Sequence, residues 1–346
     1  MNEKYYQTLK SVETEDWLDF HVIRPICYYC AKAFAALHVH PNTVTILSMV
    51  FGAGSCVFFA HGCTFYEGTE GLGYNLLAIL LLMIADILDC TDGQLARMTG
   101  QKSRLGRILD GVAGFVWFTP IYAALVYRFY IHHELEFTLL GIEETQQNVW
   151  IATAVVFVLA LVSGAVCMAG QTRLADYYIQ VHLFFLKGEK GSELDNSARQ
   201  QELYDKMSWK GHIAEKLFQY SYVGYTKKQE AATPQFQRLM NSLREKFGSA
   251  DRMPSHIRET FHKRSRMLMF WNGLLTFNFR SFWMFLFCLF DVPVFNFLFE
   301  IIVMGLLAKY VNSCYESLSK KLADTVDNRS HALLWHCQWA CSPRSC

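Results

Sequence analysis

Long apolar blocks constrain this chain more than any other feature of its sequence. An α-helix needs roughly 20 mostly apolar residues to cross a bilayer. Six blocks meet that requirement, at about 43–62, 74–96, 106–130, 149–171, 267–290 and 292–314. Hydrophobic residues make up 52% of the sequence and charged residues only 18%, which a soluble protein of 346 residues would not gather into such blocks. The sequence predicts an all-α integral membrane protein with six transmembrane helices.

The residues ahead of the first block predict a helix that lies along the membrane surface. The stretch from His21 to His38 is apolar on one side and has Arg24 and Lys32 among its residues. A helix of that kind lies in the interface. We therefore expect residues 1–42 to form an N-terminal arm followed by an interfacial amphipathic helix. The polar, acidic start has no signal-peptide pattern, so the internal spans are expected to direct insertion.

Basic residues fall on alternate connections between the blocks. The link between the second and third blocks has Lys102, Arg104 and Arg107, whereas the connections 62–73 and 131–148 have acidic residues and no Lys or Arg. Cytoplasmic loops are the ones enriched in Lys and Arg. The sequence thus predicts that both termini and the basic connections face the cytoplasm, across the inner membrane if the protein is bacterial.

The segment 173–266 is too long for a simple loop and predicts a helical cytoplasmic insertion between the fourth and fifth spans. It contains helix-like stretches at Gln200–Met207 and Phe236–Phe247, separated by glycines and prolines. Its simplest role would be packing or dimerisation. The expected organisation is 43–172 for spans one to four with the active site, 173–266 for the insertion, 267–314 for spans five and six, and 315–346 for a cytoplasmic tail.

Acidic residues inside an apolar block point to function, because ionisable groups within a membrane are costly. Asp89 and Asp92 are three residues apart near the end of the second block, so they lie on one helix face. Asp110 follows a short basic turn near the start of the third block. Converging carboxylates need cations between them, and oxygen ligands favour Mg²⁺ or Mn²⁺. We expect Asp89, Asp92 and Asp110 to hold two such ions, which would neutralise a pyrophosphate.

Small residues and an arginine accompany these acids. Gly93 and Ala96 leave room beside the carboxylates, and Arg97 suits phosphate oxygens because its guanidinium is planar and always charged. The alternative is a helix-packing surface with an internal salt bridge, which a single pair of aspartates would favour. The longer run of matched residues favours a substrate site.

That run resembles the signature of the CDP-alcohol phosphotransferases, also called CDP-alcohol phosphatidyltransferases, which reads D-x2-D-G-x2-A-R-x8-G-x3-D-x3-D. At the signature spacings this chain has Asp89, Asp92, Gly93, Ala96, Arg97, Gly106 and Asp110. Pro41-Asn42-Thr43-Val44-Thr45, at the start of the first block, resembles the P-N-x-[IV]-T sequence of the same family. Six spans and an interfacial N-terminal helix are also similar to the family fold.

The resemblance implies a transferase that moves a substituted phosphate from a CDP-alcohol, such as CDP-diacylglycerol, to a small polar alcohol and releases CMP. It implies two Mg²⁺ or Mn²⁺ ions on the aspartates, and a CDP site formed by Gly93, Ala96, Arg97, Gly106, Asn42 and Thr45. Family members are usually homodimers in contact with membrane lipids. No nucleic-acid partner is expected.

One signature position differs. Gly114 stands where the family has its last aspartate, the proposed general base and a metal ligand. Losing a positioned base typically lowers a rate by about 10²–10⁴-fold. Asp86, one turn before Asp89, offers a substitute carboxylate, so we assign Asp110 and Asp86 as the catalytic candidates. Two alternatives stay open: a metal-bound water or the acceptor's own phosphate takes the proton, or the protein binds its substrate with little or no catalysis.

Further basic residues are candidates for binding the acceptor. Arg173 follows the fourth block and Arg280 lies within the fifth, and arginines near these places look similar to those of family members that use inositol phosphate. An ion pair with an aspartate, or snorkelling of Arg173, would explain them equally well. Lys102 and Arg104 would serve the acceptor or contact lipid head groups. An inositol or inositol-phosphate acceptor is our first expectation.

Two other classes of protein remain as alternatives. One is a non-catalytic homologue that binds CDP-lipid or partners an active subunit, which Gly114 favours. The other is a secondary transporter with an acidic cation site, against which the run from Asp86 to Arg97 argues.

Overall fold

All regular elements of the protein that the structure describes are helices. The computed structural model describes residues 3–9, 11–15, 17–63, 69–101, 103–209 and 213–327. The N-terminal part comprises α1 (Glu3–Tyr6), the π-helical turn η1 (Asp19–Ile23) and α2 (Arg24–Ala36). The remaining elements are α3 (Pro41–His61), α4 (Thr69–Thr99), α5 (Arg104–Ile131), α6 (Glu134–Leu140), α7 (Gln146–Leu161), η2 (Val162–Met168), α8 (Ala169–Lys187), η3 (Glu189–Gly191), α9 (Ser197–Lys206), α10 (Ile213–Ala232), α11 (Pro234–Phe247), η4 (Ala250–Arg252), α12 (Ser255–Gly273), α13 (Phe277–Leu289), α14 (Pro293–Leu298), η5 (Phe299–Met304) and α15 (Gly305–Asp327).

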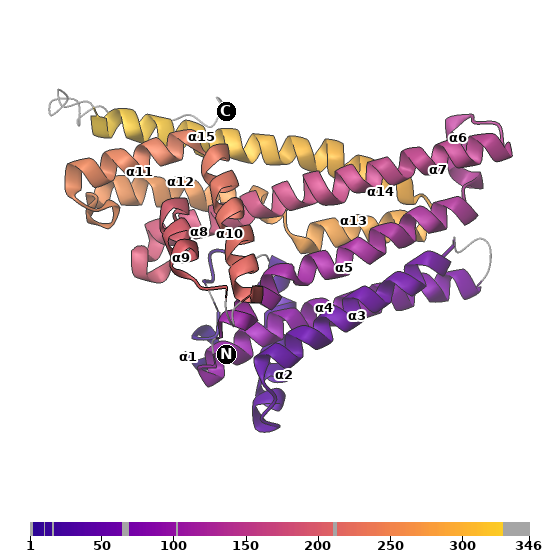
Figure 1. Ribbon diagram of the computed structural model, residues 1–346, viewed down its shortest axis with the longest axis horizontal. Helices are drawn as coiled ribbons and strands as arrows, with labels where there is room; N and C mark the ends of the chain where they lie inside the picture. Colours follow the sequence, from indigo (N-terminus) through magenta and orange to yellow (C-terminus); the bar gives the residue numbers. More distant parts are fainter. Residues whose placement is uncertain are drawn as a thin grey trace.

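Five helical runs among the described residues are long and apolar enough to cross a bilayer. They are Pro41–His61, Glu70–Thr99, Ile108–Ile131, Gln146–Lys187 and Pro293–Asp327. In Figure 1 the long helices of the bundle lie roughly side by side, with α3, α4 and α5 on one side and α7, α14 and α15 on the other. The predicted all-helical membrane architecture is confirmed at this level.

The predicted fifth span, 267–290, is not one continuous helix. Its first residues belong to α12, which ends at Gly273, and its last residues form α13, which has 13 residues. At about 1.5 Å per residue, α13 reaches about 20 Å, which is short of a hydrocarbon core of about 30 Å. The chain breaks at this point because Gly273 weakens the helix and the Thr276 hydroxyl donates to the Gly273 carbonyl at 2.6 Å.

Two helical runs are longer than the apolar blocks that predicted them. Gln146–Lys187 has 42 residues and extends over about 63 Å, twice the hydrocarbon thickness. The boundary expected at residue 173 therefore falls inside a helix, which ends only at Gly188, where φ is +78°. The boundary expected at residue 315 falls inside α15 for the same reason, because neither Gly nor Pro follows Gly305 before Asp327.

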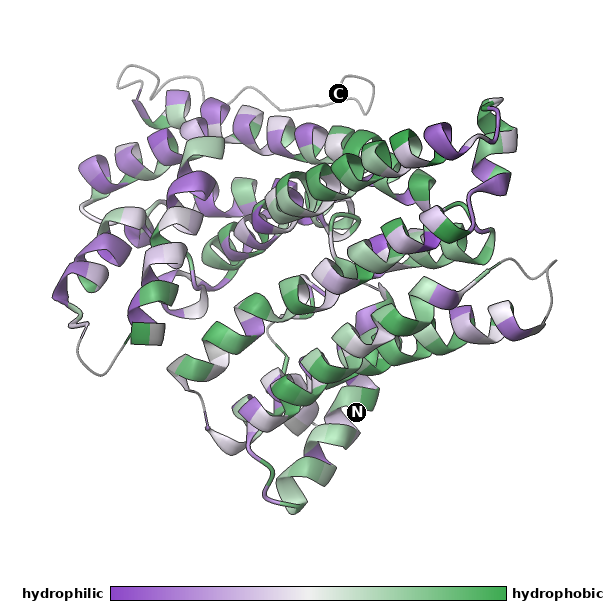
Figure 2. Cartoon of the chain, turned by 45° about the vertical axis from the view of Figure 1, so that its right-hand side comes forward, coloured by the Kyte–Doolittle hydropathy of each residue, from purple (hydrophilic) through white to green (hydrophobic). Residues whose placement is uncertain are grey.

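The described residues form two large hydrophobic cores, one at each end of these long helices, and a small cluster of Ala31, Val44 and Leu95 where α2, α3 and α4 meet. The first joins α3, α4, α5, α7, α13 and α14 around residues such as Leu82, Trp117 and Phe297. The second joins α8, α11, α12 and α15 around Tyr178, Phe261 and Tyr315. Figure 2 shows that the helices of the first core are largely hydrophobic in colour, whereas hydrophilic residues are frequent around the second.

The segment predicted as an insertion packs mainly as helices around the second core. The helix-like stretches Gln200–Met207 and Phe236–Phe247 correspond to α9 and α11, which confirms both as helices. Between them α10 packs against α5 and α8, so it returns to the membrane bundle. The stretch predicted as an amphipathic helix forms η1 and α2, and α2 packs along α4 through Cys27 and Ala31.

Candidate active site

The acidic residues of the signature lie where α4 and α5 meet. Asp86, Asp89 and Asp92 are in the last four turns of α4, and Asp110 is in the second turn of α5. Asp86, Asp89 and Asp110 line one cavity of about 930 Å³. Asp92 is buried beside it and accepts a hydrogen bond from the Thr45 hydroxyl of α3. The structure therefore brings three of the four acids to a single space and fixes the fourth from a neighbouring helix.

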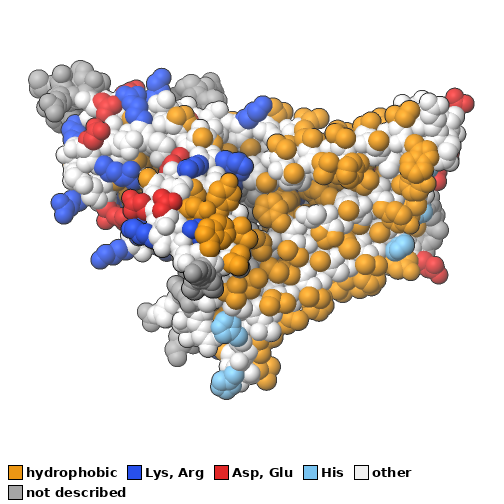
Figure 3. Space-filling view, viewed as in Figure 1, with side chains coloured by type: hydrophobic (Ala, Val, Ile, Leu, Met, Phe, Trp, Pro, Cys, Tyr) orange, Lys and Arg blue, Asp and Glu red, His pale blue; other side chains and the backbone are white. Residues whose placement is uncertain are grey.

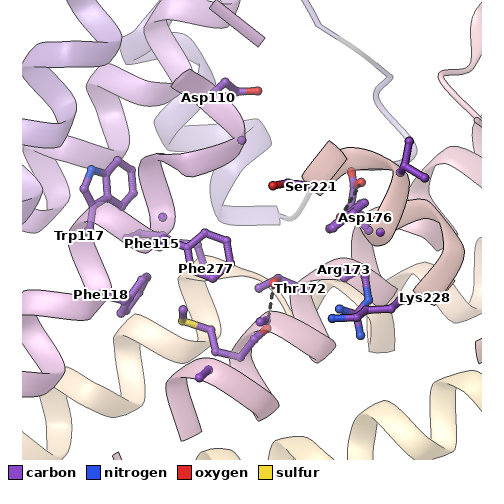
Figure 4. A pocket seen from close by; sticks show the side chains of 18 of the residues that line it. Asp110, Phe115, Trp117, Phe118, Thr172, Arg173, Asp176, Ser221, Lys228 and Phe277 are labelled. Carbon is purple, nitrogen blue, oxygen red and sulfur yellow. Dashed lines mark hydrogen bonds between the residues drawn. The ribbon is translucent and has the colours of Figure 1, made fainter. Parts of the chain in front are cut away.

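The cavity lies between the bundle and the helices of the insertion. Its lining comes from α4 and α5 on one side and from α8, α9, α10 and α13 on the other. Figure 4 shows Asp110 pointing into the open space across from Ser221 of α10, with Arg173, Asp176 and Lys228 further along the same space. Phe115, Trp117, Phe118 and Phe277 form its apolar part. The aromatic residues could contact an aliphatic chain, and the charged residues could contact a polar group.

Gly106 allows the start of α5 to approach α3. Ser103 caps α5 by accepting from the Gly106 amide at 2.9 Å, and its hydroxyl donates to the Asn42 side-chain oxygen at 3.2 Å. A Cβ atom at Gly106 would lie 2.8 Å from that same Asn42 oxygen. Asn42 and Gly106, both predicted to help hold CDP, are therefore neighbours, and any larger residue at 106 would displace them.

Arg97 lies over Gly93. A Cβ atom at Gly93 would come within 3.4 Å of the Arg97 guanidinium, and Ala96 is partly buried on the same helix. The Arg97 Nε donates to the carbonyl of Thr8, so the N-terminal arm reaches the arginine from outside the bundle. This contact leaves the other guanidinium nitrogens beside Gly93, where a phosphate would meet little side-chain bulk.

The acidic residues fit a divalent-metal site by their chemistry. Asp89 Oδ1 is buried and has no hydrogen-bond partner among the described residues. A buried oxygen without a partner is costly unless a cation or a donor meets it. Because carboxylate oxygens suit Mg²⁺ or Mn²⁺, the aspartates are compatible with the predicted ions. In a compact three-ligand group, one ligand atom from each residue lies within 4.8 Å of the others. The carboxylate oxygens of the signature aspartates are spread more widely than that.

The predicted acceptor residues have different surroundings. Arg173, at the start of α8, lines the cavity. Arg280 also touches the cavity, but its side chain is 1% exposed and forms an ion pair with Glu300 at 3.0 Å and a hydrogen bond to Gln171 at 2.8 Å. Its partner is thus a glutamate of η5 rather than an aspartate of the signature. Lys102 and the side chain of Arg104 lie outside the described residues.

Sequence reasoning missed the part of the cavity that the insertion forms. Gln201 and Tyr204 of α9 and Tyr220, Lys227 and Lys228 of α10 all line it. The frequent aromatic and basic residues between 200 and 228 were the available signal, although without the fold they indicate only packing.

A tyrosine of α10 also lies beside the cavity. The Tyr225 hydroxyl donates to the Asp176 carboxylate at 3.3 Å. Burial, and then the nearby Asp176 charge, raise the pKa of Tyr225, so its hydroxyl stays protonated near neutral pH. Tyr225 therefore acts as a hydrogen-bond donor on this side of the cavity.

Gly114 faces the same cavity. A Cβ atom built at Gly114 would meet no other atom within 4 Å. Packing therefore does not require glycine at this position, and an aspartate would fit there, one turn beyond Asp110.

Together, apolar helices of membrane-spanning length around a cavity with buried aspartates define an integral membrane protein with an acidic, metal-compatible site. Residues 38–182 match the family model described as CDP-alcohol phosphatidyltransferase, which confirms the predicted family resemblance over these residues. No curated protein and no solved structure matches the chain. The matched range is less than half of the chain and contains α3 to α7 and most of α8.

Proposed function

We propose that the protein transfers a substituted phosphate group from a CDP-alcohol, such as CDP-diacylglycerol, to the hydroxyl of a small polar alcohol and releases CMP. One observation supports this proposal more than any other. Asp86, Asp89 and Asp110 line one cavity beside the apolar bundle, with Asp92 buried next to it and Arg97 over Gly93 on the same helix. The family match over residues 38–182 gives the same reaction class.

The proposed topology has six membrane segments, with both termini and the cavity on the cytoplasmic side. The break between α12 and α13 would then lie near the cytoplasmic surface, with α13 as the short fifth segment. In Figure 3 the Lys and Arg side chains of the visible face gather at the end formed by the insertion, and the opposite end of that face shows acidic side chains. This asymmetry is typical of a cytoplasmic end rich in basic residues. We also expect a homodimer.

The donor would bind with its pyrophosphate beside Asp89, Asp92 and Asp110. Two Mg²⁺ or Mn²⁺ ions held by these residues would neutralise the phosphate charge and stabilise the leaving CMP. Thr45 fixes the Asp92 carboxylate through its hydroxyl. Arg97 would contact phosphate oxygens, and the small residues Gly93, Ala96 and Gly106 would let the cytidine and phosphates approach the backbone.

The acceptor hydroxyl attacks the β-phosphate while a carboxylate takes its proton. Asp86 and Asp110 line the cavity together, and Asp86 stands in for the aspartate that the family has at position 114. The new phosphate–oxygen bond forms as the bond to CMP breaks, so CMP leaves as the phosphomonoester. The product is a lipid with a phosphodiester-linked polar head group.

We propose inositol or an inositol phosphate as the acceptor. Arg173, Lys227 and Lys228 give the far side of the cavity three cationic side chains, and the Tyr225 hydroxyl adds a donor. Cationic groups in a partly enclosed space favour a phosphate. The charge of Arg280 is offset by Glu300, so Arg280 would orient the acceptor rather than attract it. Lys102 and Arg104 stay in the proposal as further acceptor or head-group contacts.

A second candidate function is binding without catalysis. Gly114 favours it, because the residue leaves open space where the family has its general base. A protein of this kind would hold CDP-lipid or pair with an active subunit.

The deciding experiment measures CMP release from CDP-diacylglycerol by the purified protein with Mg²⁺ or Mn²⁺ and a panel of acceptors that includes inositol and inositol phosphate. Asp110→Asn should abolish release, whereas the matched control Glu134→Gln, in α6 outside the cavity, should leave it unchanged. Gly114→Asp should fold normally and increase the rate. If the native protein releases no CMP and Gly114→Asp does, the result would favour a protein that binds its substrate without catalysis. If neither protein releases CMP and neither binds CDP-lipid, both proposed functions would be rejected.

A further inference from the structure

A second cluster of metal-ligand side chains lies outside the cavity. Glu13 of the N-terminal arm, His182 of α8 and His262 of α12 present ligand atoms that all lie within 4.8 Å of one another. Glu13 Oε2 lies 2.8 Å from His262 Nε2 and 3.2 Å from His182 Nε2. These three residues come from segments far apart in the sequence, so the fold alone brings them together.

The contacts around His182 suit a histidine that binds a metal through one ring nitrogen and a hydroxyl through the other. The Ser265 hydroxyl donates its single proton to the His262 carbonyl at 3.0 Å, and His182 Nδ1 lies 2.7 Å from that hydroxyl oxygen. In the tautomer in which His182 Nδ1 donates to this hydroxyl, Nε2 presents a lone pair toward the Glu13 carboxylate, 3.2 Å away. In that tautomer a cation held between the two acceptors removes their repulsion.

The His182 side chain is completely buried, so a ligand that it binds lies inside the protein. A metal ion shared by all three residues would supply a positive charge to Glu13 and use one lone pair from each imidazole ring. The Ser265 hydroxyl then provides the outer hydrogen bond that orients a histidine ligand.

We propose that Glu13, His182 and His262 bind one Zn²⁺ or a similar transition-metal ion. Two imidazoles and one carboxylate are a donor set that Zn²⁺ uses, with a fourth position for water. Ligands about 2.0–2.1 Å from a tetrahedral ion lie about 3.3 Å apart. The Glu13–His182 separation of 3.2 Å matches this value, and the Glu13–His262 separation of 2.8 Å would widen by about 0.5 Å on binding. This donor set differs from the all-oxygen aspartates, which suit Mg²⁺ or Mn²⁺.

The ion would fasten the N-terminal arm across the donor side of the cavity. The Thr8 carbonyl, on one side of Glu13 in the sequence, accepts from Arg97. Glu15, on the other side, forms an ion pair with Arg24 at 2.8 Å. Because α8 and α12 belong to the second core, a metal bridge would tie the arm to that core and hold it against Arg97.

The test compares metal binding by the full-length protein in detergent after removal of metal with a chelator. Zinc content after reloading and desalting should be about one equivalent higher in the native protein than in His262→Gln or Glu13→Gln. The matched control Asp89→Asn should keep that equivalent. His262→Gln preserves size and a polar end, and an unchanged elution profile and thermal unfolding without metal would confirm that it folds. Equal zinc content in the native protein and His262→Gln would overturn the site.

The role of the ion in holding the arm has its own measurement. Trypsin cleavage within the first 20 residues should slow at least several-fold when Zn²⁺ is added to the native protein, and should not change in His262→Gln. Zinc that binds at His262 but leaves the cleavage rate unchanged would keep the metal site and reject the fastening role. Neither readout depends on CMP release, so both are independent of the proposed transferase function.

Discussion

The two walls of the cavity are built in different ways. The donor wall uses Asp86 to Asp110, which two consecutive helices and their short connection bring together. The opposite wall uses Arg173, Gln201 and Tyr204 of α9, residues of α10 between Tyr220 and Lys228, and Arg280. Their positions depend on packing between distant segments. Residues that lie close together in the sequence form a motif that can be recognised from the sequence alone. Residues that are brought together only by tertiary packing form no such motif.

The difference predicts that one buried ion pair supports the opposite wall. Glu300→Gln leaves Arg280 without a full counter-charge in buried surroundings, which typically costs about 3–5 kcal/mol of stability. Glu300 also accepts from Tyr122 and Ser163, so the loss spreads to α5 and η2. We expect a lower unfolding temperature in detergent and a partial recovery in the double variant Arg280→Met with Glu300→Gln. A stable single variant would show that the pair is dispensable.

A substitution in the donor wall should lower the rate of CMP release rather than the stability of the protein. Asp89→Asn keeps the side-chain shape but removes a charge from a buried oxygen that has no partner among the described residues. We expect CMP release to fall about 10²–10³-fold, the scale for losing one group that stabilises developing charge. The control Asp324→Asn, on α15, changes an exposed ion pair with Arg238 of α11 and should have little effect. Equal losses in both would contradict the assignment.

These two walls also mark how far the sequence could predict the molecule. The apolar blocks predicted most of the long helices because burial in lipid depends on local composition. The signature predicted that Asp89, Asp92 and Asp110 would lie close together, and the structure places Asp89 and Asp110 on one cavity with Asp92 buried beside it. Both predictions rest on interactions within a few tens of residues.

The remaining features depend on contacts that no local pattern records. The break between α12 and α13 interrupts a mostly apolar block, and α10 returns to α5 and α8 from a segment far along the chain. The partner of Arg280 is Glu300, and Glu13 meets His262 at a sequence separation of 249 residues. Residue type suggested that these charges need partners, but the choice of partner required the fold.

Removing the hydrogen bond between Thr45 of α3 and Asp92 of the donor wall should have a smaller effect. Thr45→Val removes the hydroxyl that donates to Asp92 while keeping the side-chain volume. Loss of a hydrogen bond behind a metal ligand typically lowers metal affinity about 10–100-fold. The Mg²⁺ concentration for half-maximal CMP release should therefore rise by that factor. Thr43→Val, an exposed neighbour on the same helix, is the matched control. A shift in maximal rate at saturating Mg²⁺, without a shift in Mg²⁺ dependence, would argue against the positioning role of Thr45.

The smallest expected effect tests whether the opposite wall attracts a phosphate. Lys228 is exposed at the edge of the cavity, and an exposed charge pair is worth about 0.2–1 kcal/mol, or up to about five-fold in binding. Lys228→Ala should therefore raise the KM for inositol phosphate by about two- to five-fold and leave the KM for inositol unchanged. Lys206→Ala, an exposed lysine of α9, is the control. The difference should shrink as salt is added, because screening weakens exposed charges first. An equal rise for both acceptors would mean that Lys228 shapes the wall without attracting the phosphate, and would leave Arg173 as the cation to vary next.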